Sequence, residues 1–65
     1  MLTARQARKI TELAIATKEW ECTRREALLE FLFNFYEATG FARAPLSTEL
    51  ENMSEEDLME IYLNI

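Results

Sequence analysis

The stretch that decides the fold is residues 24–38, which read RREALLEFLFNFYEA. At about 100° per residue, its apolar side chains spread over roughly 240° of a helical wheel, whereas a surface helix needs only ~100°. The polar strip that remains is narrow: Glu26, Glu30, Asn34 and Glu37. Such a helix requires cover on nearly all sides, from the rest of the chain or from a second chain.

Local signals place both ends of this helix. Thr23 and Glu26 have the spacing of a capping box, with Thr23 as the N-cap and Glu26 three residues later. After residue 38, Gly40 supplies the left-handed position that commonly ends a helix. These signals predict a helix over residues 24–38.

A second amphipathic pattern precedes it. Thr3 is a good N-cap, and apolar residues then recur at spacings of three and four as far as Trp20. The pattern predicts a helix over residues 4–20. No Gly or Pro interrupts residues 4–38, so one continuous helix is the alternative, although the capping box favours two helices or a bend near Cys22.

The C-terminal third predicts one further helix. Ser54 is followed by three acidic residues, which suit the first turn of a helix, and apolar residues then share one face over 55–64. Residues 42–45 read as a connector, with Ser47 capping a short turn up to Glu51. We therefore expect an all-α fold of one domain over 1–65: an antiparallel helical hairpin with a short C-terminal helix packed across it.

Chain length predicts association. A chain of 65 residues buries only about 60% of its unfolded surface, and below ~70–80 residues a core usually needs a staple. One cysteine and no histidine exclude an internal disulfide and the usual zinc sites, which leaves oligomerisation. We expect a homodimeric helical bundle; the alternative is a monomer with an unusually aromatic core. The expected dimer or partner interface is Trp20, Phe31, Leu32, Phe33, Phe35 and Tyr36.

Charge is distributed unevenly along the chain. Residues 1–25 carry six bases and three acids, whereas residues 44–65 carry six acids and no base. The acidic third is a candidate surface for a basic partner: Glu51, Glu55, Glu56, Asp57 and Glu60. Arg5, Arg8 and Lys9 form a basic helical face, which supports the alternative function of a dimeric DNA-binding regulator.

The composition argues against catalysis. Without histidine, no side chain has an unperturbed pKa near 7, and a single glycine excludes a Gly-rich phosphate loop. We predict no catalytic, cofactor-binding or metal-binding residue. No signal peptide and no run approaching 18 apolar residues is present, and a lone thiol suits a reducing compartment, so a cytoplasmic protein that does not span a membrane is expected.

Two short stretches resemble known segments. Residues 39–47 resemble the TG…LS spacing around the recognition helix of phage-repressor-type helix-turn-helix domains, but Pro45 lies where that helix should continue and would break it. Residues 53–62 are similar to a segment of several short bacterial regulatory proteins, a likeness that consists mostly of the capped amphipathic helix itself. Neither resemblance assigns a family or a binding residue.

The function expected from these features is that of a small interaction protein. Small, acidic, helical chains without catalytic residues are typical of regulators and inhibitors from bacteria or their phages, which act by binding another protein. A structural subunit of a larger assembly is a further possibility.

Overall fold

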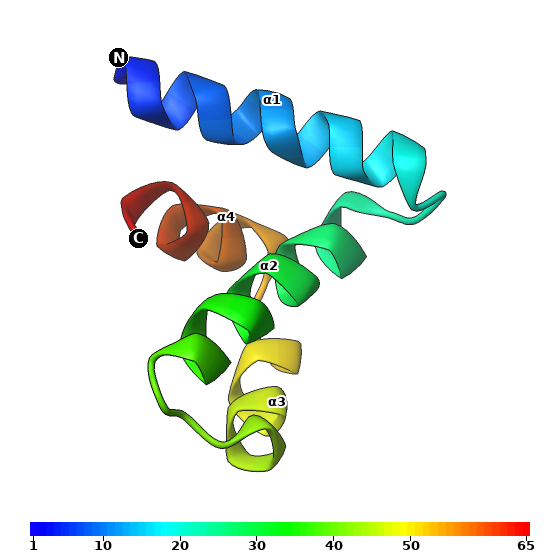
Figure 1. Cartoon of the computed structure of the whole chain (residues 1–65), viewed down its shortest axis with the longest axis vertical. Helices are drawn as coiled ribbons and strands as arrows, with labels where there is room; N and C mark the ends of the chain where they lie inside the picture. Colours follow the sequence, from blue (N-terminus) through cyan, green and yellow to red (C-terminus); the bar gives the residue numbers. More distant parts are fainter.

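Four α-helices follow one another in the computed structural model of the chain (Figure 1). They are α1 (Ala4–Glu19), α2 (Arg24–Ala38), α3 (Arg43–Glu51) and α4 (Glu55–Asn64). The structure describes residues 1–65, leaving aside the side chain of Arg43. The described backbone contains no strand, so the all-α class is confirmed, and helices lie within one residue of the three predicted ranges.

Residues 4–38 form two helices rather than one. α1 ends at Glu19 with Trp20 as its C-cap, and Glu21 then adopts a φ of 52°, in the left-handed region that non-glycine residues seldom occupy. Thr23 and Glu26 form the predicted capping box, with the Thr23 hydroxyl accepting from the Glu26 backbone N–H. The chain reverses at this point, so that α2 turns back beneath α1 (Figure 1).

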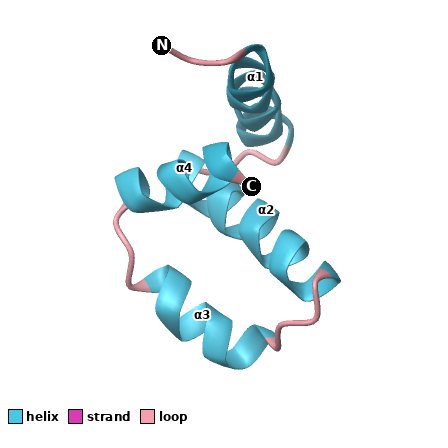
Figure 2. Cartoon of the chain, turned by 90° about the vertical axis from the view of Figure 1, so that its left-hand side faces the viewer, coloured by secondary structure: helices cyan, strands magenta, loops and turns pink.

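α2 is the central helix, because it packs against each of the other three. α4 also contacts α1, as expected for a C-terminal helix that lies across the hairpin (Figure 2). Together the helices bury one core cluster: Leu13, Ala27, Leu28, Leu32, Phe33, Leu46, Leu50, Leu58 and Tyr62. The broad apolar arc of α2 is therefore covered in large part by the chain itself.

The prediction of a connector at residues 42–45 is wrong, because Ala42 is the N-cap of α3 and residues 43–45 form its first turn. Pro45 is only the third residue of this helix, in the first turn, where backbone N–H groups have no acceptor inside the helix. A proline there costs no helical hydrogen bond, so Pro45 does not break α3. Leu46 and Leu50, four residues apart, then face α2 and are buried. The fold has four helices where three were expected.

An arginine from α2 holds the end of α3. The Arg25 guanidinium donates to the carbonyl oxygens of Glu51, at 2.6 Å, and Met53, at 2.7 Å. Carbonyl groups at a helix C-terminus have no partner inside the helix and carry partial negative charge, so a cation is favourable there. At the other end of α3, Ala42 provides no side-chain cap. Arg25 therefore ties the C-terminal end of α3 to the start of α2.

Candidate interaction surfaces

All five residues of the expected acidic surface are exposed: Glu51, Glu55, Glu56, Asp57 and Glu60. Three of them form the first turn of α4, where the Ser54 hydroxyl caps the backbone N–H of Asp57 at 3.1 Å and negative charge favours the helix N-terminus. The Glu51 carboxylate accepts from the hydroxyl of Ser47 at 2.9 Å. These acids thus stabilise helices as well as lining the surface.

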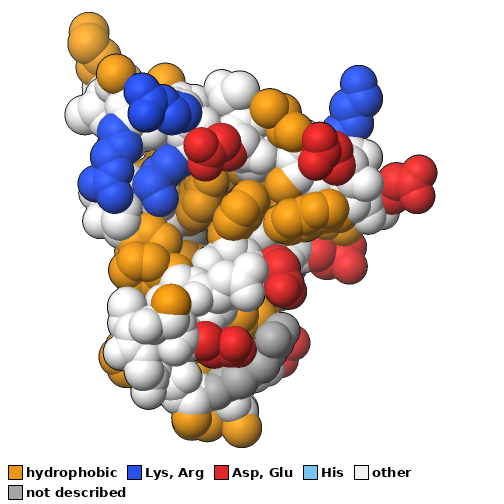
Figure 3. Space-filling view, viewed as in Figure 1, with side chains coloured by type: hydrophobic (Ala, Val, Ile, Leu, Met, Phe, Trp, Pro, Cys, Tyr) orange, Lys and Arg blue, Asp and Glu red, His pale blue; other side chains and the backbone are white. Residues whose placement is uncertain are grey.

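The basic residues expected to contact nucleic acid lie over the N-terminal half of α1, where Lys and Arg side chains gather in Figure 3. Two of them make contacts within the chain. Arg5 donates to the backbone oxygen of Ile65, and the Lys9 ammonium lies 4.6 Å from the centre of the Tyr62 ring. Arg8 is exposed. Arg5 and Lys9 therefore help to hold α4 against α1.

The pKa values of Lys9 and Tyr62, which contact each other, are both shifted, mainly by burial. Burial lowers the pKa of the Lys9 ammonium, the Arg5 charge adds to this effect, and the Glu12 carboxylate opposes it. Burial raises the pKa of the Tyr62 hydroxyl above its ordinary 10.0, and Glu12 raises it further. The Tyr62 hydroxyl donates to the Lys9 backbone oxygen at 2.8 Å. The pair is a structural link between α1 and α4.

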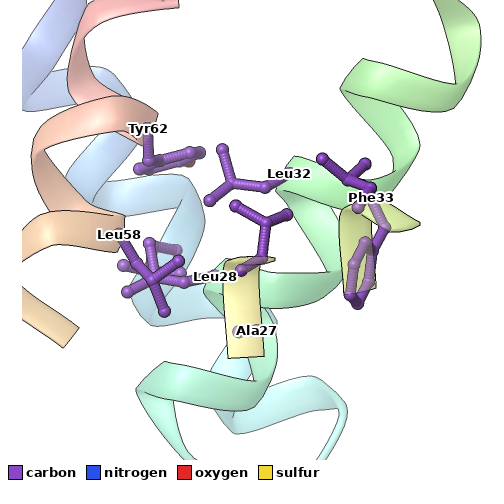
Figure 4. Close-up of a cluster of buried hydrophobic side chains, with 9 residues drawn as sticks. Ala27, Leu28, Leu32, Phe33, Leu58 and Tyr62 are labelled. Atoms are coloured by element: carbon purple, nitrogen blue, oxygen red, sulfur yellow. The ribbon is translucent and has the colours of Figure 1, made fainter. Parts of the chain in front are cut away.

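The six residues of the expected aromatic interface divide into two groups. Leu32 and Phe33 are buried inside the protomer (0% and 6% exposed), where Leu32 points toward Leu58 and Tyr62, and Phe33 points away from that group (Figure 4). They belong to the protomer's own core and are not available as surface contacts in this fold. The structure leaves four residues of the set at least partly accessible: Trp20, Phe31, Phe35 and Tyr36.

Three of these side chains form what we call the aromatic surface: Trp20, Phe31 and Phe35. Trp20 is 47% exposed and Phe35 40% exposed. Phe31 and Phe35 lie one turn apart on α2, and the Phe31 ring is 5.4 Å from the rings of both Trp20 and Tyr62, measured between centroids. Because Tyr62 is buried, this row of rings fixes the exposed indole of Trp20 on the core.

A groove that the sequence did not predict opens between α2 and α3. It measures ≈ 360 Å³, and its walls are largely apolar: Tyr36, Phe41, Ala42, Pro45, Leu46, Glu49, Leu50, Met53 and Ile61. Phe41 is 58% exposed and meets the Tyr36 ring edge-on at 5.4 Å. One sequence feature could have indicated this groove: Phe41 is a large apolar residue directly after the helix-ending Gly40.

A second hollow, of ≈ 410 Å³, lies beside α1. Its lining includes Ile10, Thr17, Cys22, Arg24 and Met59. Cys22 is a half-buried free thiol. Among the side chains that the structure describes, no group of three or more His, Cys, Asp or Glu residues is placed to hold a metal ion.

The helices are also short and mixed in polarity. Nowhere in the described part of the chain does a helix have the length and apolar character needed to span a bilayer.

Comparisons with known proteins give no relative from which a function can be carried over. No family model matches the chain, and no curated protein or solved structure matches it either. The function is therefore inferred from the chain's own surfaces.

Proposed function

We propose that this chain is a small non-enzymatic interaction protein. Two copies associate, and the pair binds another protein and regulates or inhibits it through the aromatic surface of Trp20, Phe31 and Phe35.

The fixed exposure of Trp20 and Phe35 is the observation that supports this proposal. Aromatic side chains, and Trp and Tyr in particular, contribute most to binding when they are held rigid and become fully desolvated by a partner. Trp20 is 47% exposed although its ring packs on Phe31, and Phe35 is 40% exposed although its ring meets Tyr36 at 5.3 Å. Both rings therefore present apolar area at a small cost in conformational entropy.

Site-specific crosslinking in cells of the source organism tests the proposal. We would place p-benzoylphenylalanine at Phe35, and at Ile15 as a control. Ile15 is a good match, because it is 51% exposed on α1 and lies off the apolar stripe that packs on the core. We expect a discrete adduct with a second protein from position 35 and none from position 15. Trp20→Ser should weaken that adduct.

Two results would contradict the proposal. One is an equal set of adducts from positions 35 and 15, which would indicate non-specific collision. The other is an adduct of the chain with itself alone. If the acidic surface bound the target instead, Trp20→Ser would leave the adduct unchanged, whereas crosslinking repeated in a high-salt lysate would give no adduct because salt screens exposed charges.

A further inference from the structure

The N-terminal segment of the chain carries an apolar side chain that its own fold leaves uncovered. Leu2 is 52% exposed, directly before the cap of α1. A residue at this position often packs on the fourth residue of the helix, but here that residue is Ala7, whose methyl group covers little. Residues 1–9 contain three bases and no acid. The segment is both apolar and basic.

The groove between α2 and α3 has the complementary character. Its walls are largely apolar, and Glu49 lines it. On the α4 side, the exposed Asp57 lies one turn before the lining residue Ile61, and so on the same helix face. Residues 44–65 carry six acids and no base. An occupant with one bulky apolar side chain and adjacent positive charge would fit this site.

Leu2 cannot reach the groove of its own chain. The N-terminus and α3 lie at opposite ends of the molecule in both views (Figures 1 and 2), and the longest dimension is 31 Å. Residues 1 and 2 together span only ~7 Å even when fully extended. The segment of one copy can, however, enter the groove of another. Because every copy has one segment and one groove, two copies can exchange them about a two-fold axis.

We propose that the groove between α2 and α3 binds the N-terminal segment of a second copy of this chain, with Leu2 in the groove and Arg8 beside Glu49. This inference rests on the association of two copies in the proposed function, not on the binding of another protein. Two small segments bury less than the ~1,600 Å² of a standard interface, so the dimer is weak. Its contacts are partly ionic and exposed, so it is also sensitive to salt.

Light-scattering mass on a sizing column tests the inference, at two protein concentrations and two salt concentrations. At high protein and low salt we expect the wild type to approach twice 7.6 kDa, and to return toward 7.6 kDa on dilution or in 1 M salt. Ala42→Trp fills the groove and Leu2→Ser removes the anchor, so both should stay near 7.6 kDa. The matched controls, Ala38→Trp and Ile15→Ser, change exposed residues outside the groove and should behave as the wild type.

A charge swap tests the pairing directly. Arg8→Glu and Glu49→Arg should each weaken the dimer, and the double variant, which keeps the wild-type net charge, should restore it. A wild type that is monomeric under every condition would overturn the inference, as would controls that disrupt the dimer as much as the groove variants do. A dimer that survives Ala42→Trp and 1 M salt but is lost in Phe35→Ser would place the contact on the aromatic surface. That result would overturn the exchange of segments and leave the proposed association of two copies standing.

Discussion

The two sides of α2 differ in how completely they exclude water. Toward α4, Leu28, Leu32 and Leu58 are fully buried, and Tyr62 closes the contact with a hydrogen bond to α1. Toward α3, Leu50 and Leu46 are 3% and 9% exposed, and the groove opens beside them. The first side is a three-helix core, whereas on the second side α3 packs mainly on α2.

The difference shows how a small chain divides its roles. Segments with few buried contacts open most readily, and binding surfaces are often drawn from them. Here α3 depends on two leucines and on Arg25, and it forms one wall of the groove. α3 thus supplies more of the groove's lining than α2 or α4 does, while it packs mainly on α2 alone.

The largest effect is expected from Leu32→Ala in the three-helix core. Removing this fully buried side chain loses transfer free energy and leaves a cavity, which together cost about 3 kcal/mol of unfolding free energy. Leu46→Ala should cost less, about 2 kcal/mol, because the groove allows water to reach that site. Urea unfolding followed by circular dichroism measures both. Equal losses would show that the two sides of α2 do not differ.

Arg25→Ala should act on α3 alone. Loss of two charged hydrogen bonds to the carbonyls of Glu51 and Met53 costs about 2 kcal/mol. Hydrogen exchange should rise throughout α3 and remain slow in α4. Arg25→Lys is the matched control: it keeps the charge but lacks the planar fork, so partial protection is expected. Faster exchange in α4 to the same degree would mean that α3 and α4 open together.

The sequence predicted the three helices whose ends carry strong local signals. Thr3, Thr23 and Ser54 cap their helices as expected, and Gly40 adopts a φ of 103°. The sequence signals missed α3, because a proline usually marks a connector and only its place in the first turn makes Pro45 compatible with a helix. They also left open whether residues 4–38 form one helix or two, because Glu21 has a left-handed backbone conformation at a position where glycine is usual.

The candidate surfaces were harder to predict than the helices. A wheel showed that Leu32, Phe33 and Phe35 all lie on the apolar arc, but it could not show which part of that arc a neighbouring helix covers. Because the sequence does not indicate α3, it predicts Phe33 at an interface, whereas Phe33 is only 6% exposed. The groove could not be predicted for the same reason, because most of its lining belongs to α3 and to the two residues directly before it.

Tyr62→Phe should lower the free energy of unfolding by less than Leu32→Ala or Arg25→Ala does. Loss of the hydrogen bond to the Lys9 carbonyl costs about 1 kcal/mol at neutral pH. The folded pKa of Tyr62 is raised, so the stability from its neutral form is fully present below the ordinary value of 10.0 and is lost as pH rises through the folded value. Thermal melts from pH 8 upward should therefore show the gap between wild type and Tyr62→Phe narrowing. A constant gap would contradict a buried, neutral hydroxyl.

The smallest effect is expected at the start of α2, the helix that both sides share. The backbone N–H of Thr23 and then its hydroxyl hold the pKa of Glu26 below its ordinary 4.5. The stability from this carboxylate is present above pH 4.5 and is lost as pH falls through the lowered folded value.

Glu26→Gln keeps a side-chain oxygen for the capping box but does not titrate. We expect it to be slightly less stable than the wild type at pH 7, with the difference in melting temperature closing as pH falls from 4.5 through the lowered folded pKa. Because α2 packs on both α3 and α4, Glu26→Gln should raise hydrogen exchange at pH 7 equally in α3 and α4. This differs from Arg25→Ala, which should raise exchange in α3 alone. A rise confined to either α3 or α4 would mean that the capping box stabilises only that side of α2.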